Sequence, residues 1–378
     1  MSATRRLLTV VGDANDISTW SGIPYFFLRA ATRQGLLDAG VSLHPKALLW
    51  RRAAWNIRSL LLTSKAGGYQ YSRDFLSKLF AQACLSEHEP LDFVTHFPLL
   101  PPRPWGRAWT VTPYIDATLK QNFDDYGAGH RIDRTHRENA LARERDAYQA
   151  AKRVVCFSRW AADAVTSFYN VPSNHCHVVL PGANLIEEQV PDAELSEMPH
   201  TAGGALRLGF IGKDWERKGL RLLLDIAASL EQRGVAAEVV TIGPDAKELP
   251  RHPLLRPQGF IDKHHDMERF VRLVRSFHFG CLLSSVEAFG ISTFECLRLG
   301  VPVVGRRAGG IVDSIPEGLG FLFDPERELD DIVSTLESHA KDADRYSALR
   351  RRVLSRAREF SWDRTALQFK ELFEGDQL

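Results

Sequence analysis

The chain has 378 residues, which is enough for two domains of roughly 150 to 200 residues, each with its own core. Its 48 Lys and Arg residues balance 47 Asp and Glu residues, so no large field of one sign points to nucleic acid or an acidic polymer as the main partner. Five scattered cysteines without a CxxC pair, and no run of about 18 apolar residues, favour a cytoplasmic protein with reduced thiols and no membrane-spanning helix.

The first half predicts strands that alternate with helices. The run 7–11 is β-branched and ends at Gly12, and a polar loop then leads through Ser21 and Gly22 into a helical pattern. Short β-prone runs follow at residues 93–95, 108–111 and 153–157. Such alternation favours a parallel sheet covered by helices, and we assign residues 1–186 to this domain.

A change of composition separates the two halves. Residues 187–204 carry acidic side chains, two prolines and a glycine pair, with little apolar periodicity, so we interpret them as a linker. Residues 205–360 then repeat the alternation more clearly, with strands predicted at 206–211, 237–242, 279–283, 301–304 and 320–323, and helices at 220–232, 266–276 and 293–299. Charged helices follow Pro325, and residues 361–378 carry a last amphipathic helix that could return to the first domain.

This order of elements is typical of a nucleotide-binding domain, whose ligands lie at the carboxyl ends of the strands. No GxGxxG motif follows any predicted strand, which argues against a dinucleotide cofactor. The loop 212–219 sits between a strand and a helix and carries Lys213 and Lys218, which can neutralise phosphate oxygens. The alternative is an ordinary solvated, charged loop.

A second loop, 284–295, holds two carboxylates. Glu287 lies after a strand end and Glu295 in the first turn of the next helix, so the two can reach different hydroxyls by charge-assisted hydrogen bonds. Free amides at the start of that helix suit an anionic diphosphate. The alternative is structural, because Ser292 and Glu295 fit the spacing of a capping box and Glu287 could be a surface loop residue.

Taken together, these elements resemble the donor domain of glycosyltransferase family 4, a retaining family with the two-domain GT-B fold. The resemblance extends from residue 206 to about residue 325 and rests on four motifs in the family's order and spacing. The motifs are Gly212-Lys213 with Lys218-Gly219, Glu287 with Glu295, Gly300-Val301-Pro302-Val303-Val304, and Gly309-Gly310. One position departs, since Lys213 stands where the family usually has arginine, which keeps the charge but loses a bidentate fork.

The resemblance implies an α/β GT-B fold in which two Rossmann-like domains face each other across a cleft. It further implies that Lys213 and Lys218, after Gly212, hold the donor diphosphate and that Glu295 binds the ribose hydroxyls. Glu287 and the amides of Phe289 and Gly290 would address the transferred sugar, with Ile291 and Ser292 near the phosphates and the backbone around Phe260 at the base.

The first half matches the family less specifically. Ser21 and Gly22 resemble the loop that faces the diphosphate, and His96 resembles an acceptor-side histidine that could be catalytic with Glu287 and Lys218, although a packed or surface histidine is an equal alternative. Many members of the family have a His-Asp pair where this chain has Ile115-Asp116, so the aspartate is kept and isoleucine replaces the histidine. Ser158 follows a strand end as in the family, or simply caps the next helix.

The resemblance implies a retaining hexosyltransferase that moves a sugar from a nucleotide-diphosphate sugar, such as a UDP- or GDP-sugar, to a hydroxyl of a glycan or lipid-linked glycan. Lysines and a helix end supply the charge stabilisation, so no metal and no other cofactor is expected. Asp342-Ala343-Asp344 fits a DxD pattern, but it lies in a charged helical tail and favours a solvated face.

The pathway expected from such relatives is polysaccharide or glycoconjugate synthesis, in the cytoplasm, with peripheral association at the inner membrane face left open. The segment 51–107 is aromatic and arginine-rich, which suits a glycan or lipid-linked phosphate, or ordinary packing. Two other functions remain as alternatives: a non-catalytic nucleotide-sugar or glycan-binding module, and a GT-B nucleotide-sugar epimerase. A non-catalytic module would be expected to have lost a lysine or a glutamate of the site, and this chain keeps them. An epimerase is not expected to need Lys218 together with Glu287 and Glu295.

Overall fold

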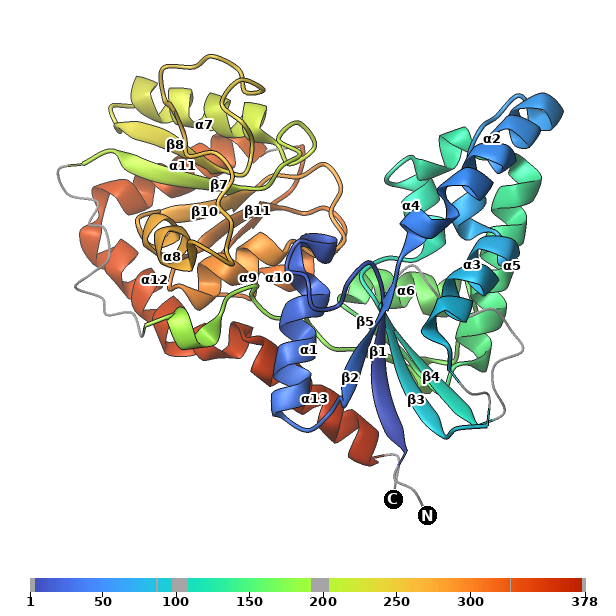
Figure 1. Cartoon of the computed structure of the whole chain (residues 1–378). Helices are drawn as coiled ribbons and strands as arrows, with labels where there is room; N and C mark the ends of the chain where they lie inside the picture. The colour runs from blue at the N-terminus through green and yellow to red at the C-terminus, as the bar shows by residue number, and fades with distance from the viewer. Residues whose placement is uncertain (1–3, 86–87, 97–107, 192–203, 327, 376–378) are drawn as a thin grey trace. The chain divides into compact units, whose positions relative to one another are not determined.

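The computed structural model describes residues 4–85, 88–96, 108–191, 204–326 and 328–375. The chain divides into two compact units (Figure 1). The first comprises Met1–Leu180 with Thr365–Leu378, and the second comprises Pro181–Arg364. The stretch 187–204 that the sequence predicts as a linker comes after the boundary at Leu180 and therefore belongs to the second unit. Its residues 192–203 lie outside the described residues.

The first unit is built on a six-stranded sheet in which all strand pairs are parallel. The strands run in the order β2-β1-β3-β4-β5-β6. Their bounds are β1 (Arg5–Val11), β2 (Ala39–Leu43), β3 (Leu91–His96), β4 (Trp109–Ile115), β5 (Val154–Cys156) and β6 (Cys176–Val178). Because β2 and β3 lie on opposite sides of β1, the order reverses between β1 and β3, the place where open α/β sheets bind their ligands.

Helices cover both faces of this sheet (Figure 1). Their bounds are α1 (Ile23–Arg33), α2 (Leu49–Thr63), α3 (Arg73–Phe80), α4 (Leu119–Asp124), α5 (Arg134–Ala150) and α6 (Arg159–Ser167). The helix α13 (Trp362–Glu374) joins this unit from Thr365 onward. The ring of Phe369 in α13 lies 5.3 Å from that of Phe27 in α1 and 4.7 Å from that of Tyr114 in β4, so the last helix completes the core of the first unit.

The second unit contains another six-stranded parallel sheet, in the order β12-β11-β10-β7-β8-β9. Its strands are β7 (Leu206–Ile211), β8 (Ala237–Ile242), β9 (Leu255–Pro257), β10 (Phe279–Leu282), β11 (Val303–Arg306) and β12 (Gly320–Phe323). Its helices are α7 (Leu220–Gln232), α8 (Met267–Arg275), α9 (Ile291–Arg298), α10 (Ile311–Ser314), α11 (Glu328–Lys341) and α12 (Ala343–Arg356). The order reverses between β7 and β10, which are neighbours with Cys281 opposite Phe210.

Most predicted elements are confirmed, and those of the second unit match to within two or three residues. The sequence did not predict β2, β6 and β9. All three strands are short and lie at sheet edges, and the glycine of β2 and the proline of β9 weaken the β signal further. The two α/β units agree with the fold class expected from the sequence.

Candidate functional site

The second sheet brings two loops together at the point where its strand order reverses. Residues 212–219 follow β7 and residues 283–290 follow β10, and both loops lie at the carboxyl ends of these adjacent strands. Their backbones touch, because the Ser285 amide donates to the Arg217 carbonyl at 3.1 Å. Gly219 has φ +79°, and a Cβ there would lie 2.3 Å from the Leu283 carbonyl oxygen, so only glycine allows this approach.

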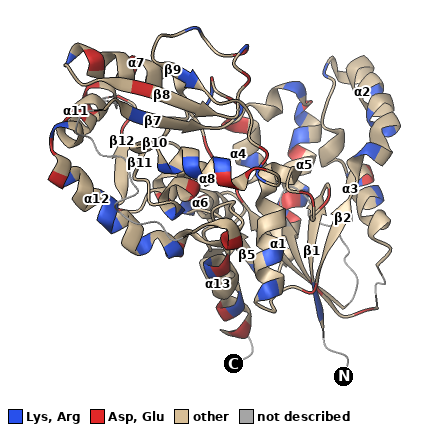
Figure 2. Ribbon diagram, turned by 60° about the vertical axis from the view of Figure 1, so that its left-hand side comes forward, with Lys and Arg blue, Asp and Glu red and all other residues tan. Residues whose placement is uncertain are grey.

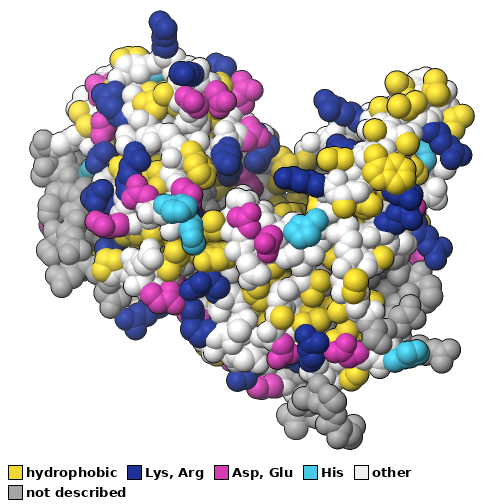
Figure 3. Space-filling view, viewed as in Figure 1, with side chains coloured by type: hydrophobic (Ala, Val, Ile, Leu, Met, Phe, Trp, Pro, Cys, Tyr) yellow, Lys and Arg dark blue, Asp and Glu magenta, His cyan; other side chains and the backbone are white. Residues whose placement is uncertain are grey.

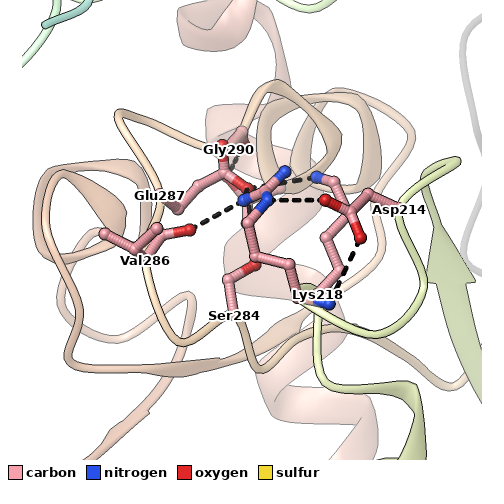
Figure 4. Close-up of polar contacts among 8 residues, drawn as sticks. Asp214, Lys218, Ser284, Val286, Glu287 and Gly290 are labelled. Atoms are coloured by element: carbon pink, nitrogen blue, oxygen red, sulfur yellow. Dashed lines mark hydrogen bonds and ion pairs between the residues drawn. The ribbon is translucent and has the colours of Figure 1, made fainter. Parts of the chain in front are cut away.

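The carboxylate of Glu287 is the centre of this junction (Figure 4). Its Oε2 accepts hydrogen bonds from Lys218 Nζ at 3.2 Å, from Arg217 Nη1 at 3.2 Å and from Ser284 Oγ at 3.3 Å. Arg217 is held in turn by Asp214 and by the Val286 carbonyl, to which it donates at 2.7 Å. Two cations, Lys218 and Arg217, and two anions, Glu287 and Asp214, thus share a polar cluster that links the β7 and β10 loops.

The cluster is shielded from water. The side chains of Glu287 and Lys218 are 13% and 16% exposed, and that of Arg217 is 27% exposed. Burial raises the pKa of Glu287, but the charges of Lys218 and Arg217 and their hydrogen bonds outweigh burial, and the net shift is downward. Glu287 is therefore ionised at neutral pH and can act as an acceptor of hydroxyl hydrogen bonds.

The Gly309-Gly310 motif holds the backbone of Glu287. The Gly310 amide donates to the Glu287 carbonyl at 2.9 Å. Gly309 has φ +53°, and a Cβ at this position would lie 2.2 Å from the same carbonyl oxygen. The motif thus acts through packing, since any larger residue would displace the loop that carries Glu287.

Glu295 lies in α9 and is buried, with 3% of the residue exposed. Its Oε1 accepts a hydrogen bond from Lys263 Nζ, which also donates to the Asn184 carbonyl at 3.3 Å and lies 4.1 Å from the centre of the Phe270 ring. The capping-box alternative for Glu295 is wrong, because the residue before α9 is Gly290 and Ser292 lies inside the helix. The carboxylate of Glu295 is instead held by the loop that follows β9.

The remaining predicted donor residues surround this junction. Lys213 is exposed and its Nζ lies 4.7 Å from the centre of the Phe260 ring, so the residues predicted to meet the diphosphate and the base contact each other. Phe289 is buried against Phe294, with ring centres 4.9 Å apart, while Ile291 and Ser292 are partly exposed in the first turn of α9. Among the described residues, no ion pair joins Lys213 to Glu287, so the two predicted lysines lie in different surroundings.

The first unit places two predicted segments at its own reversal point. Trp20 and Ser21 adopt left-handed φ values of 52° and 57°, and Gly22, with φ 87°, precedes α1. Two successive non-glycine residues in this region cost about 1 kcal/mol or more each, a type of strain that clusters at ligand-binding loops. His96 ends the adjacent strand β3, where it pairs in register with Tyr114, and its catalytic role stays a prediction.

Several other residues singled out in the sequence have structural roles. Ser158 caps α6 by accepting from the Ala161 amide at 3.3 Å, and Asp342 caps α12 by accepting from the Arg345 amide at 2.9 Å. In the aromatic segment 51–107, Trp55 donates to the Gly67 carbonyl at 3.0 Å and packs against Tyr69, which fits the alternative of ordinary packing. Within the described ranges no group of three or more His, Cys, Asp or Glu side chains is arranged to hold a metal ion.

Three contributors to the site were not predicted: Arg217, Ser284 and Lys263. Arg217 and Ser284 stand beside predicted residues in the same two loops, but neither position belongs to a motif. Lys263 follows β9, a strand that the sequence did not predict. A basic residue after a strand end is the signal that could have identified Lys263 as a site residue. Its contact with Glu295 joins positions 32 residues apart and depends on the sheet topology.

Comparisons with known proteins find a family match in the second half of the chain. Residues 197–359 match the family described as "Glycosyl transferases group 1". A D-inositol 3-phosphate glycosyltransferase of Corynebacterium urealyticum is 27% identical over 287 residues, which cover 71% of this chain and 66% of that protein. The chain spans about half to two thirds of the length of the curated relatives of this kind that it matches.

Solved structures show the same fold. A sucrose-phosphate synthase of Thermosynechococcus elongatus superimposes with a TM-score of 0.66 at 14% identity, covering 98% of both chains. HepE of Anabaena, solved in complex with UDP and glucose, gives a TM-score of 0.60 at 13% identity, covering 98% of this chain and 99% of the other. These neighbours confirm the predicted GT-B fold class. The stretch of this chain that matches the glycosyl transferases group 1 family includes Lys218, Glu287 and Glu295.

Proposed function

We propose that this chain is a retaining glycosyltransferase of family 4 that moves a hexosyl group from a nucleotide-diphosphate sugar to an acceptor hydroxyl, without a metal ion. The observation that carries the proposal is the ionised Glu287, held by Lys218 and Arg217 where the β7 and β10 loops meet. The group 1 domain match over residues 197–359 and the names of the relatives support the same reaction class.

Glu287 is suited to bind the transferred sugar. The three contacts described above all go to Oε2, and no described residue donates to Oε1. A sugar hydroxyl can donate to that second oxygen, and a hydrogen bond to a charged acceptor contributes about 1.5–3 kcal/mol. Because Lys218 and Arg217 fix the orientation of the carboxylate, little side-chain entropy is lost when the sugar binds.

Negative charge grows on the diphosphate as it leaves, and three features of the site can stabilise it. Lys218 uses one of its three ammonium hydrogens on Glu287 and keeps the others for phosphate oxygens. Lys213 extends from the same loop beside Phe260, and the first amides of α9 point outward from its N-terminus at residues 291 and 292. Fixed dipoles and ammonium groups of this kind supply the electrostatic stabilisation that a metal ion provides in other transferases.

Glu295 is proposed to accept hydrogen bonds from the ribose hydroxyls, with Lys263 holding its carboxylate in place. In a retaining reaction of this type the acceptor attacks from the face that the diphosphate leaves, so no protein nucleophile is required and the protein acts by positioning and charge stabilisation. Neither glutamate is then one of a glycosidase pair. His96 is proposed to act on the acceptor side.

The proposed partners are a nucleotide-sugar donor and a glycan or lipid-linked glycan acceptor, and no nucleic acid. The curated relatives are named for D-inositol 3-phosphate, which adds a phosphorylated polyol to the acceptors worth testing. We place the reaction in the cytoplasm, with peripheral attachment to the inner face of the membrane. Polysaccharide or glycoconjugate synthesis is the pathway class that such a reaction serves.

A thermal-shift panel of UDP, GDP, ADP and their common sugars tests the donor site. We expect one nucleotide series to stabilise the wild type and both Glu295→Ala and Lys218→Ala to abolish the shift. Lys341→Ala is the matched control, because Lys341 pairs with Glu337 on an exposed face of α11 and should leave the shift unchanged. Failure of every nucleotide to bind, or binding that ignores both substitutions, would overturn the donor assignment.

A further inference from the structure

Helix α2 of the first unit has its polar and apolar faces reversed relative to an ordinary surface helix. Its inward side carries Ser59, which is 4% exposed and donates to the Lys65 carbonyl at 2.7 Å. Thr63 on the same side donates to the Ser59 carbonyl at 2.8 Å. These two hydrogen bonds close on the helix itself and on the residues directly after it, and Trp55 is the side chain of α2 that packs against the core around Tyr69.

The outward side of α2 is apolar instead. Leu61 is 80% exposed, Leu62 71% and Trp50 65%. Of the eleven large apolar side chains that are exposed in the described part of the chain, six lie on this one helix: Leu49, Trp50, Ile57, Leu60, Leu61 and Leu62. Figure 3 shows the resulting hydrophobic surface over α2 at the upper right.

The apolar residues form one stripe. At about 100° per residue, positions 49, 50, 53, 54, 57, 60 and 61 fall within an arc of about 140°, close to the width by which a buried helix faces a core, whereas Leu62 falls outside this arc, on the side of Arg51 and Arg58. Arg58 and Arg51 border the stripe on one side and Arg52 lies beyond its other edge, by the same geometry. Single exposed apolar residues are ordinary, but a stripe of this width is typical of a binding surface.

The charge around the stripe has one sign. Between Asp38 and Asp74 the sequence contains no acidic residue, and its basic residues are Lys46, Arg51, Arg52, Arg58, Lys65 and Arg73. Figure 2 shows Lys and Arg but no Asp or Glu along α2. Arg51 pairs with Asp74 at 3.8 Å and stacks on Trp50, whereas no described acidic side chain pairs with Arg52 or Arg58. A partner surface that complements α2 therefore has an apolar layer that receives the stripe and negative charges that face the neighbouring arginines.

We propose that α2 is an interfacial helix that docks this chain on an anionic lipid bilayer. Its leucines and Trp50 would enter the boundary between headgroups and acyl chains, and Arg52 and Arg58 would contact lipid phosphates. The helix has 15 residues and lies in the plane of the interface in this proposal. In the described parts of the chain, no helix is both long and apolar enough to cross a membrane.

The proposal names the surface for the peripheral attachment assumed in the proposed function, but it does not depend on the donor site. α2 belongs to the first unit, and Lys218, Glu287 and Glu295 belong to the second. A lipid-docking helix on the unit expected to bind the acceptor favours a lipid-linked acceptor over a soluble glycan. Membrane binding and nucleotide binding can therefore be measured, and can fail, separately.

Flotation of the full chain with vesicles tests the proposal. We expect the wild type to float with vesicles of phosphatidylcholine and phosphatidylglycerol, and less with phosphatidylcholine alone or in high salt. The double variant Leu60→Ser with Leu61→Ser, which changes two exposed residues of the stripe, should lower the partition coefficient by about tenfold or more. Arg52→Gln with Arg58→Gln should weaken binding to the anionic vesicles and leave binding to phosphatidylcholine unchanged.

Two controls make the result specific. Leu367→Ser changes a 46% exposed leucine on α13 of the same unit and should float as the wild type does. Lys218→Ala should also float normally, so a failed donor site would not be mistaken for failed docking. The proposal is overturned if the wild type does not float, if the leucine variant floats equally well, or if light scattering shows a wild-type dimer that this variant converts to a monomer.

Discussion

Replacing Glu287 with glutamine separates the two roles that the structure gives to the β7 and β10 loops. The substitution keeps the shape of the side chain but removes the charge that Lys218 and Arg217 face. Removing one partner of a fully buried ion pair costs about 3–5 kcal/mol. Here the cations are 16% and 27% exposed and Arg217 keeps Asp214, so we expect a smaller loss, of about 1–2 kcal/mol, in the free energy of unfolding.

Binding of the nucleotide should respond in the opposite direction. Without the carboxylate, the diphosphate becomes the counter-charge for Lys218 and Arg217, so the affinity of Glu287→Gln for the free nucleoside diphosphate should stay the same or rise. Sugar transfer should fall, because the lost acceptor contact is worth about 1.5–3 kcal/mol, or roughly 10- to 100-fold in kcat/KM. Calorimetric titration with the nucleotide and a coupled assay of nucleotide release measure the two effects.

The opposite pattern would refute this reasoning. If Glu287→Gln lost nucleotide affinity while keeping its transfer rate, the carboxylate would belong to the nucleotide and not to the sugar. If both quantities were unchanged in a folded variant, the cluster would be a structural ion pair with no part in the reaction.

Two further predictions follow from other buried groups. Burial raises the pKa of Glu144 to about 7, although hydrogen bonds from Tyr169, Tyr148 and the Leu119 amide act in the opposite direction. The folded state therefore binds more protons than the unfolded state between pH 4.5 and about 7. As the pH rises through this window, the free energy of unfolding should fall by up to about 3 kcal/mol. Glu144→Gln should remove this slope in urea unfolding from pH 5 to 8, and an unchanged slope would contradict the assignment. Gly309→Ala should destabilise the chain by about 2 kcal/mol or more and abolish nucleotide-sugar binding, because its Cβ would lie 2.2 Å from the Glu287 carbonyl oxygen. Gly318→Ala, at φ +79° with no atom within 4 Å, is the matched control for the backbone cost alone, and equal losses for the two variants would exclude the packing explanation.

The sequence predicted the second unit better than the first for a physical reason. Strands such as β7 and β8 are buried on both faces and read as continuous apolar runs, and their helices begin and end at glycines and charged residues. Edge strands such as β2 and β9 carry glycine or proline and have little apolar signal, so their existence depends on pairing with a neighbour. The same limit hid Lys263, which lies in the loop after β9 and donates to Glu295.

The reversed helix α2 illustrates a second limit. Its sequence is amphipathic, and an ordinary interpretation would turn the leucines inward. In the structure Ser59 and Thr63 take the inward positions and the leucines face outward. Periodicity identifies two faces of a helix, but which face is buried is decided by the surface against which the helix packs.

The most direct test of the central claim is to follow the donor by proton NMR. The protein is mixed with the nucleotide sugar that it binds and with a pool of simple sugars, inositol phosphate and lipid-linked glycans. We predict release of the free nucleoside diphosphate together with a new glycoside signal of the same anomeric configuration as the donor, and a loss of both in Glu287→Gln. An inverted product would contradict the retaining reaction, an epimerised nucleotide sugar without release would indicate an epimerase, and binding without turnover would identify a non-catalytic module.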